Sequence, residues 1–286
     1  MAMNAHNYHI RPMQKHELEI VIGWAAEEGW NPGLHDAQSF HAADPDGYLV
    51  GLLDGQPVAS ISVVRYGSDY SFLGLYIVRP EHRGCGYGLQ IWNAGLARLG
   101  ARAIGLDGVV AQQENYRKSG FELAHRNIRF QGVASTGEGM SCAGIVRLSQ
   151  LTFDTVTRYD RAFFPAGRDA FMRAWLHQPD APALGLVQDG TLTGYGVIRP
   201  CQVGYKIGPL FADRPEHARA LLMALMRELP EGSPVFLDVP ETNRAALALA
   251  QGLGMTPMFE TARMYKGAPA LPDLNRTYGI TTFELG

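Results

Sequence analysis

The pattern of apolar and polar positions along the chain alternates between two kinds of segment. Tyr48–Leu53 and Phe72–Val78 are short, nearly continuous apolar runs bounded by turn residues, and such runs predict buried strands. Lys15–Glu28 and Gly88–Leu99 are longer and combine apolar with polar positions, which predicts amphipathic helices. Strands that alternate with helices in this way are typical of an α/β sheet with helices on both faces.

This pattern occurs twice along the chain. In the first half, we expect strands at Tyr8–Met13, Tyr48–Leu53, Val58–Tyr66, Phe72–Val78, Ala103–Asp107 and around Glu122–Phe130, helices at Lys15–Glu28, Gly88–Leu99 and Asn115–Ser119, and a loop over Gly29–Asp46. In the second half, we expect strands at Leu151–Thr157, Ala183–Gln188, Leu192–Ile198, Gly204–Phe211, Val235–Val239 and near Met258–Met264, and helices at Arg168–His177, Pro215–Leu229 and Thr242–Leu253. The two halves therefore share one order of elements.

Individual landmarks repeat at a nearly constant distance. The offsets are 189 − 54 = 135 for an Asp-Gly hairpin turn, 214 − 79 = 135 for an Arg-Pro-Glu-His elbow, and 254 − 120 = 134 for a glycine after a helix. Three landmarks in the same order predict two copies of one fold. We expect a first domain over residues 1–133, a linker over 134–150 that contains glycine and serine, and a second domain over 151–286.

Composition narrows the class of protein. The 286 residues are 46% hydrophobic and 19% charged, which allows substantial packed cores and excludes a disordered chain. A formal net charge of −3 makes nucleic acid a poor candidate as partner. Cys85, Cys142 and Cys201 are scattered, which argues against a disulfide framework or a metal site and favours a reducing cytoplasm. No signal-peptide pattern and no apolar run of roughly 20 residues is present, so we expect no membrane partner.

The six residues Arg83-Gly-Cys-Gly-Tyr-Gly88 carry the most specific chemical signal. They follow a predicted strand and a short elbow, and they lead into a predicted helix. A glycine-rich turn at a helix N-terminus presents unpaired backbone N–H groups and the positive end of the helix dipole, which together favour a phosphate or pyrophosphate. Gly86 and Gly88 allow close backbone approach, and the guanidinium of Arg83 adds a charge-assisted contact.

This Arg-x-x-Gly-x-Gly spacing resembles the acyl-CoA loop of the GNAT N-acetyltransferase superfamily. With the repeat, the whole chain resembles tandem GNAT proteins, and Glu28–Gly33, Gly105–Gly108 and Tyr278–Gly286 are similar to the bacterial YitH-like group. The resemblance implies an α/β fold of two tandem GNAT-like domains, each a mixed central β-sheet flanked by helices. It also implies an enzyme that uses acetyl-CoA to acetylate a primary amine of a small-molecule or peptide acceptor by direct attack on the thioester.

The resemblance further implies roles for individual residues. The cofactor-binding residues would be Tyr76, Ile77, Val78, Arg83, Gly84, Cys85, Gly86, Tyr87 and Gly88. Tyr116, four residues before Gly120, would protonate the leaving CoA thiolate. A tyrosine suits this role because its reference pKa of about 10 lies just above the roughly 8.5 of a thiol.

The second copy lacks these features. It keeps the elbow Arg214–His217 but continues with Ala218 and bulkier residues in place of glycines, and it has Ala250 where the first copy has Tyr116. We therefore expect acyl-CoA to bind the first domain alone. We also expect the sheet of the second domain to close one wall of the acceptor pocket, with loop Gly29–Asp46 as the other wall.

The group that deprotonates the attacking amine is left open among several residues. The strand Phe72–Val78 carries no carboxylate. Asp107 ends a strand beside the expected cofactor cleft and is taken as the catalytic candidate, with a turn-forming role as its alternative. The expected acceptor-binding residues are Glu28, Trp30, His35 and Asp36, of which the carboxylates and the histidine are further candidates for the base.

Two other functions compete with acetyl transfer. A dinucleotide oxidoreductase is suggested by Gly84-x-Gly86 at a helix start and Asp107 farther on, but Leu89 stands where that fingerprint requires its third glycine. A non-catalytic acyl-CoA sensor or interaction protein is suggested by the degenerate second copy, although Tyr116 favours an enzyme. The acceptor, the acyl length and the oligomeric state are not determined by the sequence.

Overall fold

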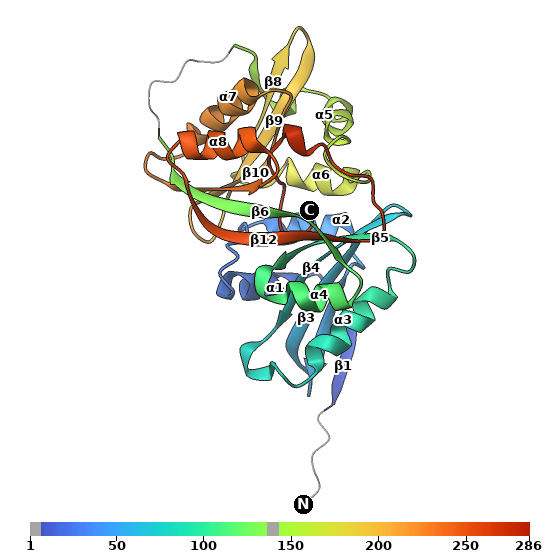
Figure 1. Ribbon diagram of the computed structural model, residues 1–286. Helices are drawn as coiled ribbons and strands as arrows, with labels where there is room; N and C mark the ends of the chain where they lie inside the picture. Colours follow the sequence, from blue (N-terminus) through green and yellow to red (C-terminus); the bar gives the residue numbers. More distant parts are fainter. Residues whose placement is uncertain (1–6, 136–142) are drawn as a thin grey trace, which may run out of the picture.

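The computed structural model describes residues 7–135 and 143–286, which form one mixed sheet with helices on both faces (Figure 1). The strands are β1 Tyr8–Pro12, β2 Tyr48–Leu53, β3 Gln56–Tyr66, β4 Tyr70–Val78, β5 Ala103–Val109, β6 Glu122–Val133, β7 Ile145–Arg147, β8 Ala183–Gln188, β9 Thr191–Pro200, β10 Tyr205–Ala212, β11 Pro234–Pro240, β12 Thr256–Lys266 and β13 Thr277–Gly279. The helices are α1 Glu17–Glu27, α2 Asp36–Ala43, α3 Tyr87–Ala97, α4 Gln113–Lys118, α5 Phe153–Asp160, α6 Asp169–Trp175, α7 Pro215–Met226 and α8 Arg244–Gly252. The predicted α/β class is confirmed.

The strands run in the order β1-β2-β3-β4-β5-β12-β6-β11-β10-β9-β8-β7, with β13 paired to β10. Among the described strands, only the pairs β4–β5 and β10–β11 are parallel. Each parallel pair is joined by a helix, α3 in the first half and α7 in the second, as a parallel crossover requires. Both halves therefore build the same unit, in agreement with the repeat in the sequence.

The last strand of each half lies in the sheet of the other half. The strand β12 pairs with β5, and β6 pairs with β11, so that β6 and β12 run side by side between the two lobes in Figure 1. The sequence indicated only that a strand around Glu122–Phe130 completes the first copy. Because the two copies are alike, each offers the other an equivalent edge, and the exchange satisfies the same backbone hydrogen bonds.

Two segments differ from the sequence prediction. Leu151–Thr157 was expected as a strand, but helix α5 begins there, because the Thr152 hydroxyl accepts a hydrogen bond from the Thr155 N–H (3.2 Å) and caps the helix. The expected loop Gly29–Asp46 contains helix α2, whose Phe40 is fully buried against Trp175 of α6. Residues far apart in sequence stabilise α2, and local patterns do not report such contacts.

The predicted linker over 134–150 is only partly within the described residues, because 136–142 lie outside them. Within it, β7 pairs with β8 at the edge of the sheet. The last residues of β1 and β7 are 147 − 12 = 135 positions apart, which is the same offset as that between the repeated landmarks of the sequence. The strand of the second half that corresponds to β1 is therefore β7, and α5 corresponds to the start of α1.

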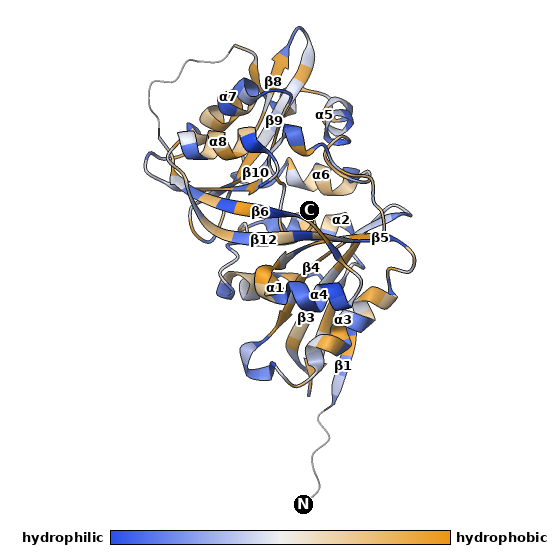
Figure 2. Ribbon diagram, viewed as in Figure 1, coloured by the Kyte–Doolittle hydropathy of each residue, from blue (hydrophilic) through white to orange (hydrophobic). Residues whose placement is uncertain are grey.

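One apolar core joins the two halves. It contains α1 and α2 from the first half and α5 and α6 from the second, and it includes Phe40, Phe72, Trp175 and Phe211. Two further cores lie under α3 and α4 in the first half and under α7 and α8 in the second. In Figure 2 the apolar positions follow the strands and the sheet-facing sides of the helices, whereas α4 is mostly hydrophilic.

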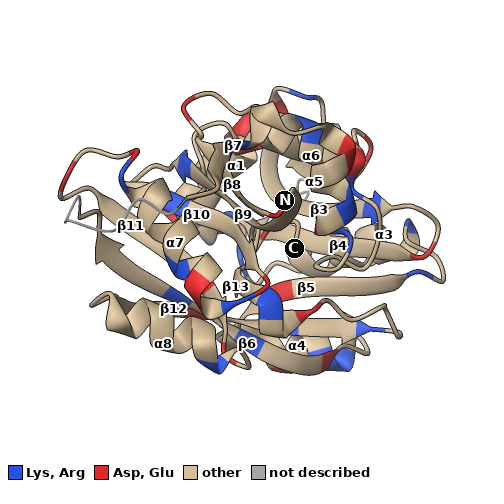
Figure 3. Ribbon diagram, turned by 90° about the horizontal axis from the view of Figure 1, so that it is seen from above, with Lys and Arg blue, Asp and Glu red and all other residues tan. Residues whose placement is uncertain are grey.

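Charged residues also join the halves inside the molecule. Three buried carboxylate–arginine pairs connect residues of different halves, namely Asp36–Arg199, Asp107–Arg263 and Arg129–Asp238. On the outside, Figure 3 shows basic and acidic residues interspersed over the elements in view. Within the described part of the chain, no helix combines the length and apolar character needed to cross a bilayer.

Candidate active site

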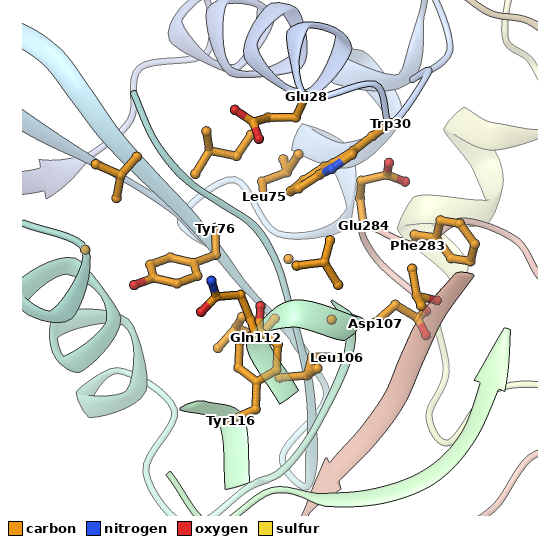
Figure 4. Close-up of a pocket in the computed structure, with 18 of the residues that line it drawn as sticks. Glu28, Trp30, Leu75, Tyr76, Leu106, Asp107, Gln112, Tyr116, Phe283 and Glu284 are labelled. Carbon is orange, nitrogen blue, oxygen red and sulfur yellow. The ribbon is translucent and has the colours of Figure 1, made fainter. Parts of the chain in front are cut away.

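A wedge opens in the sheet between the parallel strands β4 and β5. Their pairing begins at Tyr70 with Ala103 and ends at Leu73 with Leu106, after which the strands separate. Leu75 interrupts β4 with a φ of 45°, and its carbonyl accepts a hydrogen bond from the Ser60 hydroxyl (2.7 Å). Such a bulge bends a strand away from its partner. A cavity of about 590 Å³ lies in this wedge (Figure 4), within the size range of small-molecule sites.

The glycine-rich loop closes one end of the cavity. Gly84 and Gly86 have φ values of 77° and 83°, a conformation that favours glycine. The first helical hydrogen bond of α3 runs from the Gln90 N–H to the Gly86 carbonyl (3.2 Å), so the preceding amides of this first turn have no helical acceptor. The loop and the helix dipole together make the mouth of the wedge a candidate anion site.

Gly88 allows α3 to lie close against β4. A Cβ atom at this position would come within 2.8 Å of the Tyr76 hydroxyl and 3.1 Å of the Val78 side chain. The cavity wall includes seven of the predicted cofactor-binding residues, Tyr76, Ile77, Val78, Arg83, Gly84, Gly86 and Gly88. Cys85 and Tyr87 are not in the wall, and the Tyr87 ring instead packs against the Tyr8 ring, tilted by 31° at a centroid distance of 4.5 Å.

Arg83 lies at the rim of the cavity with its guanidinium already engaged. Its Nε donates to the Val78 carbonyl (2.9 Å), and its Nη2 donates to the Glu28 carboxylate. The side chain remains half exposed. Glu28 therefore holds Arg83 beside the anion site, and a phosphate there would share the arginine with this carboxylate.

Tyr116 projects from α4 into the wedge, below β4 in Figure 4. Its ring stacks on Trp92 at 5.4 Å and fits against Gly108, where a Cβ atom would lie 2.2 Å from the ring. Burial raises the pKa of Tyr116, so the hydroxyl is protonated at neutral pH. Among the described residues, no protein group hydrogen-bonds to this hydroxyl. The phenol is therefore available as a proton donor to a bound ligand.

Asp107 lines the cavity, but its carboxylate is fully engaged. The Arg263 guanidinium donates to both oxygens (3.0 and 2.5 Å), and the Asn127 amide donates to Oδ1 (2.8 Å). Burial raises the pKa of Asp107 despite the neighbouring arginine. These three bonds tie β5 to β12 and β6, so the structure gives Asp107 a role in joining the strands of the two halves.

The four predicted acceptor-binding residues separate into two groups. Glu28 and Trp30 line the cavity on the α1 side, as Figure 4 shows. His35 and Asp36 do not line it, because helix α2 carries them away from the wedge. Asp36 is fully buried and receives two hydrogen bonds from Arg199 (2.8 and 3.1 Å), which leaves it unavailable to an acceptor.

The far end of the cavity is built by the second half of the chain. Its residues there are Phe259 and Thr261 of β12, and Phe283 and Glu284 of the segment that follows β13. None of these four residues is predicted from the sequence as part of the site, because their positions depend on the exchange of β12 and on the path of residues 277–286. The resemblance over Tyr278–Gly286 assigns no role to Phe283 or Glu284, and no periodicity around Phe259 and Thr261 indicates a site.

The corresponding wedge of the second half is filled by its own chain. The pairing of β10 with β11 ends at Ile207 with Leu237, and β13 then enters between them. Gly279 of β13 packs against Leu210 and Leu237, and the Ile280 N–H donates to the Asp238 carbonyl (2.9 Å). This wedge therefore has no room for the ligand that the first wedge admits.

Comparisons with known proteins agree with this geometry. The sequence model described as "Acetyltransferase (GNAT) family" matches residues 13–121, and the one described as "Acetyltransferase (GNAT) domain" matches residues 156–279. The chain is 29% identical over 276 residues to the holothin acyltransferase of Pseudoalteromonas sp. (strain SANK 73390), covering 96% of this chain and 94% of that protein.

Solved structures show the same fold. A putative acetyltransferase from Pyrococcus horikoshii superposes with a TM-score of 0.83 at 21% identity, over 100% of this chain and 98% of that one. A tandem GNAT protein from the clavulanic acid biosynthesis pathway superposes with a TM-score of 0.64 at 16% identity, over 93% of this chain and all (100%) of that one. On its two matched regions, residues 13–121 and 156–279, this chain belongs to the GNAT superfamily as an acyltransferase with two GNAT domains in tandem.

Proposed function

We propose that this protein transfers an acetyl group from acetyl-CoA to a primary amine, and that it is a member of the YitH-like group of tandem GNAT proteins. The observation that carries the proposal is the open wedge between β4 and β5, with an anion site at one end and the Tyr116 phenol on its wall. Superfamily members generally use acyl-CoA. That the transferred acyl group is acetyl is our proposal. The free thiols of Cys85 and Cys201 agree with a reducing cytoplasm, where we place the protein.

The cofactor binds in the first domain, residues 1–133, in this proposal. The amides of Cys85 through Gly88 hold the pyrophosphate, and the edge of β4 from Tyr76 to Val78 pairs with the pantetheine arm. The second domain, residues 151–286, holds no cofactor, because β13 occupies its wedge and α7 begins with Pro215 in place of a glycine loop. Its contribution is the far wall of the acceptor pocket.

The acceptor is an amine on a compact apolar frame. The aromatic side chains of Trp30, Phe259 and Phe283 and the aliphatic Leu75 surround the end of the cavity beyond the bulge. Apolar walls with few polar groups favour small ligands that bury most of their surface. A relative named as an acyltransferase and the unengaged hydroxyl of Tyr116 support turnover over the alternative of a cofactor sensor.

Titration of acetyl-CoA into Gly86→Val tests this function. Valine at φ 83° is strained by about 1–3 kcal/mol, and its side chain occupies the place of the pyrophosphate. We expect Kd, measured by calorimetry, to rise at least ~100-fold relative to the unsubstituted protein, equivalent to about 2.7 kcal/mol. No heat of binding in the unsubstituted protein, or binding of NAD instead, would contradict the proposal.

Gly55→Val is the matched control for this experiment. Gly55 lies in the β2–β3 hairpin turn with the same φ of 83°, and at both positions a Cβ atom would meet no neighbour within 4 Å. The two variants therefore carry the same backbone strain. An equal loss of affinity in both would show that strain alone is responsible, and the loop would lose its role as the cofactor site.

A further inference from the structure

Glu284 differs from the other buried carboxylates. Glu284 is only 2% exposed, and it lines the cavity. Neither of its carboxylate oxygens has a hydrogen-bond partner among the described residues. The other buried carboxylates each bind an arginine, in the pairs Glu17–Arg11, Asp36–Arg199, Asp44–Arg65, Asp107–Arg263, Asp160–Arg168 and Asp238–Arg129. A buried carboxylate without a partner is costly, and proteins retain such groups mainly where a ligand or a reaction uses them.

The basic side chains around Glu284 form no ion pair with its carboxylate among the described residues. Arg129 and Arg199 lie within Coulombic range of its carboxylate. Arg129 donates to Asp238 and to the Trp30 carbonyl. Arg199 donates to Asp36, and its Nη1 has no hydrogen-bond partner among the described residues. Burial lowers the pKa of the third cation, Lys206, whose Nζ donates to the Trp30 carbonyl (3.4 Å). In the described chain, no lysine or arginine nitrogen lies within 4.0 Å of a Glu284 oxygen. Both oxygens are buried and keep their capacity to accept a hydrogen bond.

The backbone around Glu284 is held tightly in place. The Thr282 hydroxyl accepts hydrogen bonds from the N–H groups of Glu284 (3.0 Å) and Leu285 (2.9 Å). Gly74 of β4 packs directly on the Glu284 carbonyl, because a Cβ atom there would come within 2.2 Å of that oxygen. Gly74 immediately precedes the bulge at Leu75. The segment thus fixes Glu284 beside the point where β4 turns into the cofactor cleft, close to Trp30 and Phe283 in Figure 4.

We propose that Glu284 is the general base that receives the proton of the acceptor amine, directly or through one water. This inference rests on the proposed function. The amine nitrogen attacks the thioester carbonyl carbon, an N–C bond forms and the C–S bond breaks. Glu284 takes the proton that the ammonium form of the acceptor loses before attack, and water takes the second N–H proton once the N–C bond has formed. The Tyr116 hydroxyl gives its proton to the departing CoA sulfur. Exchange with solvent then returns a proton to Tyr116 and removes one from Glu284.

The other acidic groups of the cavity suit this role less well. Asp107 already accepts three hydrogen bonds, and its oxygens hold Arg263 and Asn127. Glu28 lies at the rim, where it binds Arg83 next to the anion site. Glu284 lies at the apolar end of the cavity, where Trp30, Phe259 and Phe283 surround the acceptor in the proposed function. The filling of the second wedge also matters for the first wedge, because the β13 strand that fills it anchors the segment that carries Glu284.

Steady-state kinetics of Glu284→Gln test this assignment, with benzylamine and aniline as acceptor probes. Benzylamine is an ammonium ion at neutral pH and must lose a proton before attack, whereas aniline is already neutral. We expect kcat for benzylamine to fall by about 10²–10⁴-fold, the usual contribution of general acid–base catalysis. The loss for aniline should be at least tenfold smaller, and acetyl-CoA affinity should stay within about twofold of the unsubstituted value.

Two controls separate a chemical role from a structural one. Glu260→Gln makes the same change on β12, outside the cavity wall, at a partly exposed carboxylate paired with Arg126, and it should leave kcat unchanged. Glu284→Asp retains the carboxylate and should keep more activity than the glutamine variant. Aspartate and glutamine variants that lose the same activity, or that both lose acetyl-CoA binding, would show that the role is structural and overturn the proposal.

The outcomes also distinguish this inference from the proposed function. Acetylation of benzylamine by both the unsubstituted protein and Glu284→Gln at equal rates would overturn the assignment of Glu284 alone. Absence of turnover of both probes by the unsubstituted protein would contradict the apolar amine acceptor of the proposed function. Equal losses for benzylamine and aniline would contradict removal of a proton from an ammonium ion by Glu284.

Discussion

Tyr116→Phe is expected to lower kcat by about 10²–10⁴-fold and to leave acetyl-CoA affinity nearly unchanged. The substitution removes only the hydroxyl, which has no protein partner among the described residues, and keeps the stacking on Trp92. Without the phenolic proton the CoA sulfur must leave as a thiolate in a partly dry site. Burial raises the pKa of Tyr116, so the phenol keeps its proton at neutral pH until the sulfur departs.

Single-turnover kinetics and calorimetry together check this prediction. Tyr265→Phe is the matched control, because Tyr265 is also a buried tyrosine whose hydroxyl has no partner within residues 7–135 and 143–286, and it does not line the cavity. A second variant, Gly108→Ala, would place a Cβ atom 2.2 Å from the Tyr116 ring and should reproduce much of the loss by displacing it. Unchanged turnover in Tyr116→Phe would remove this residue from the mechanism.

Asp238→Ala is expected to lower the free energy of unfolding by about 3–5 kcal/mol. Asp238 on β11 binds Arg129 on β6 through two hydrogen bonds (2.7 and 2.8 Å), and both side chains are only 2% exposed. Loss of the carboxylate leaves the guanidinium charged and buried without the aspartate that it binds, and Glu284 lies only within Coulombic range of it. The sheet should open where β6 enters the second half.

Urea unfolding measures this effect, and Asp154→Ala is the control. Asp154 forms an exposed pair with Arg158 one helical turn away, and pairs of that kind contribute about 0.3–0.5 kcal/mol. Arg129 also donates to the Trp30 carbonyl (2.7 Å), so Asp238→Ala should raise KM for the amine through the acceptor wall. A loss of stability no larger than that of Asp154→Ala would contradict the view that exchanged strands hold the two halves together.

Several elements could be predicted because their causes are local. Tyr48–Leu53 and Ala183–Gln188 form strands with the predicted bounds, since short apolar runs between turn residues suit only a buried strand. The loop around Gly86 was predictable for a similar reason. Its glycines adopt positive φ values just before α3, and glycine is the residue type that adopts such values most readily.

Predictions failed where a distant partner decides the conformation. Helix α2 depends on Phe40 packing against Trp175 and on Asp36 binding Arg199, and both partners come from the other half of the chain. The sequence places His35 and Asp36 in the loop that we expect to form a wall of the acceptor pocket. The buried ion pair instead removes Asp36 from the cavity.

By itself, the sequence determined the α/β class, the repeat and the glycine loop of the first half, because each depends on residues that are neighbours in the chain. Only the tertiary structure decided which strand completes which sheet, that β13 fills the second wedge, and that Phe283 and Glu284 reach the first. The two copies offer equivalent strand edges, so local preferences do not distinguish the exchanged pairing from the unexchanged one. That choice depends on the joint core and the buried ion pairs, which exist only when both halves are folded together.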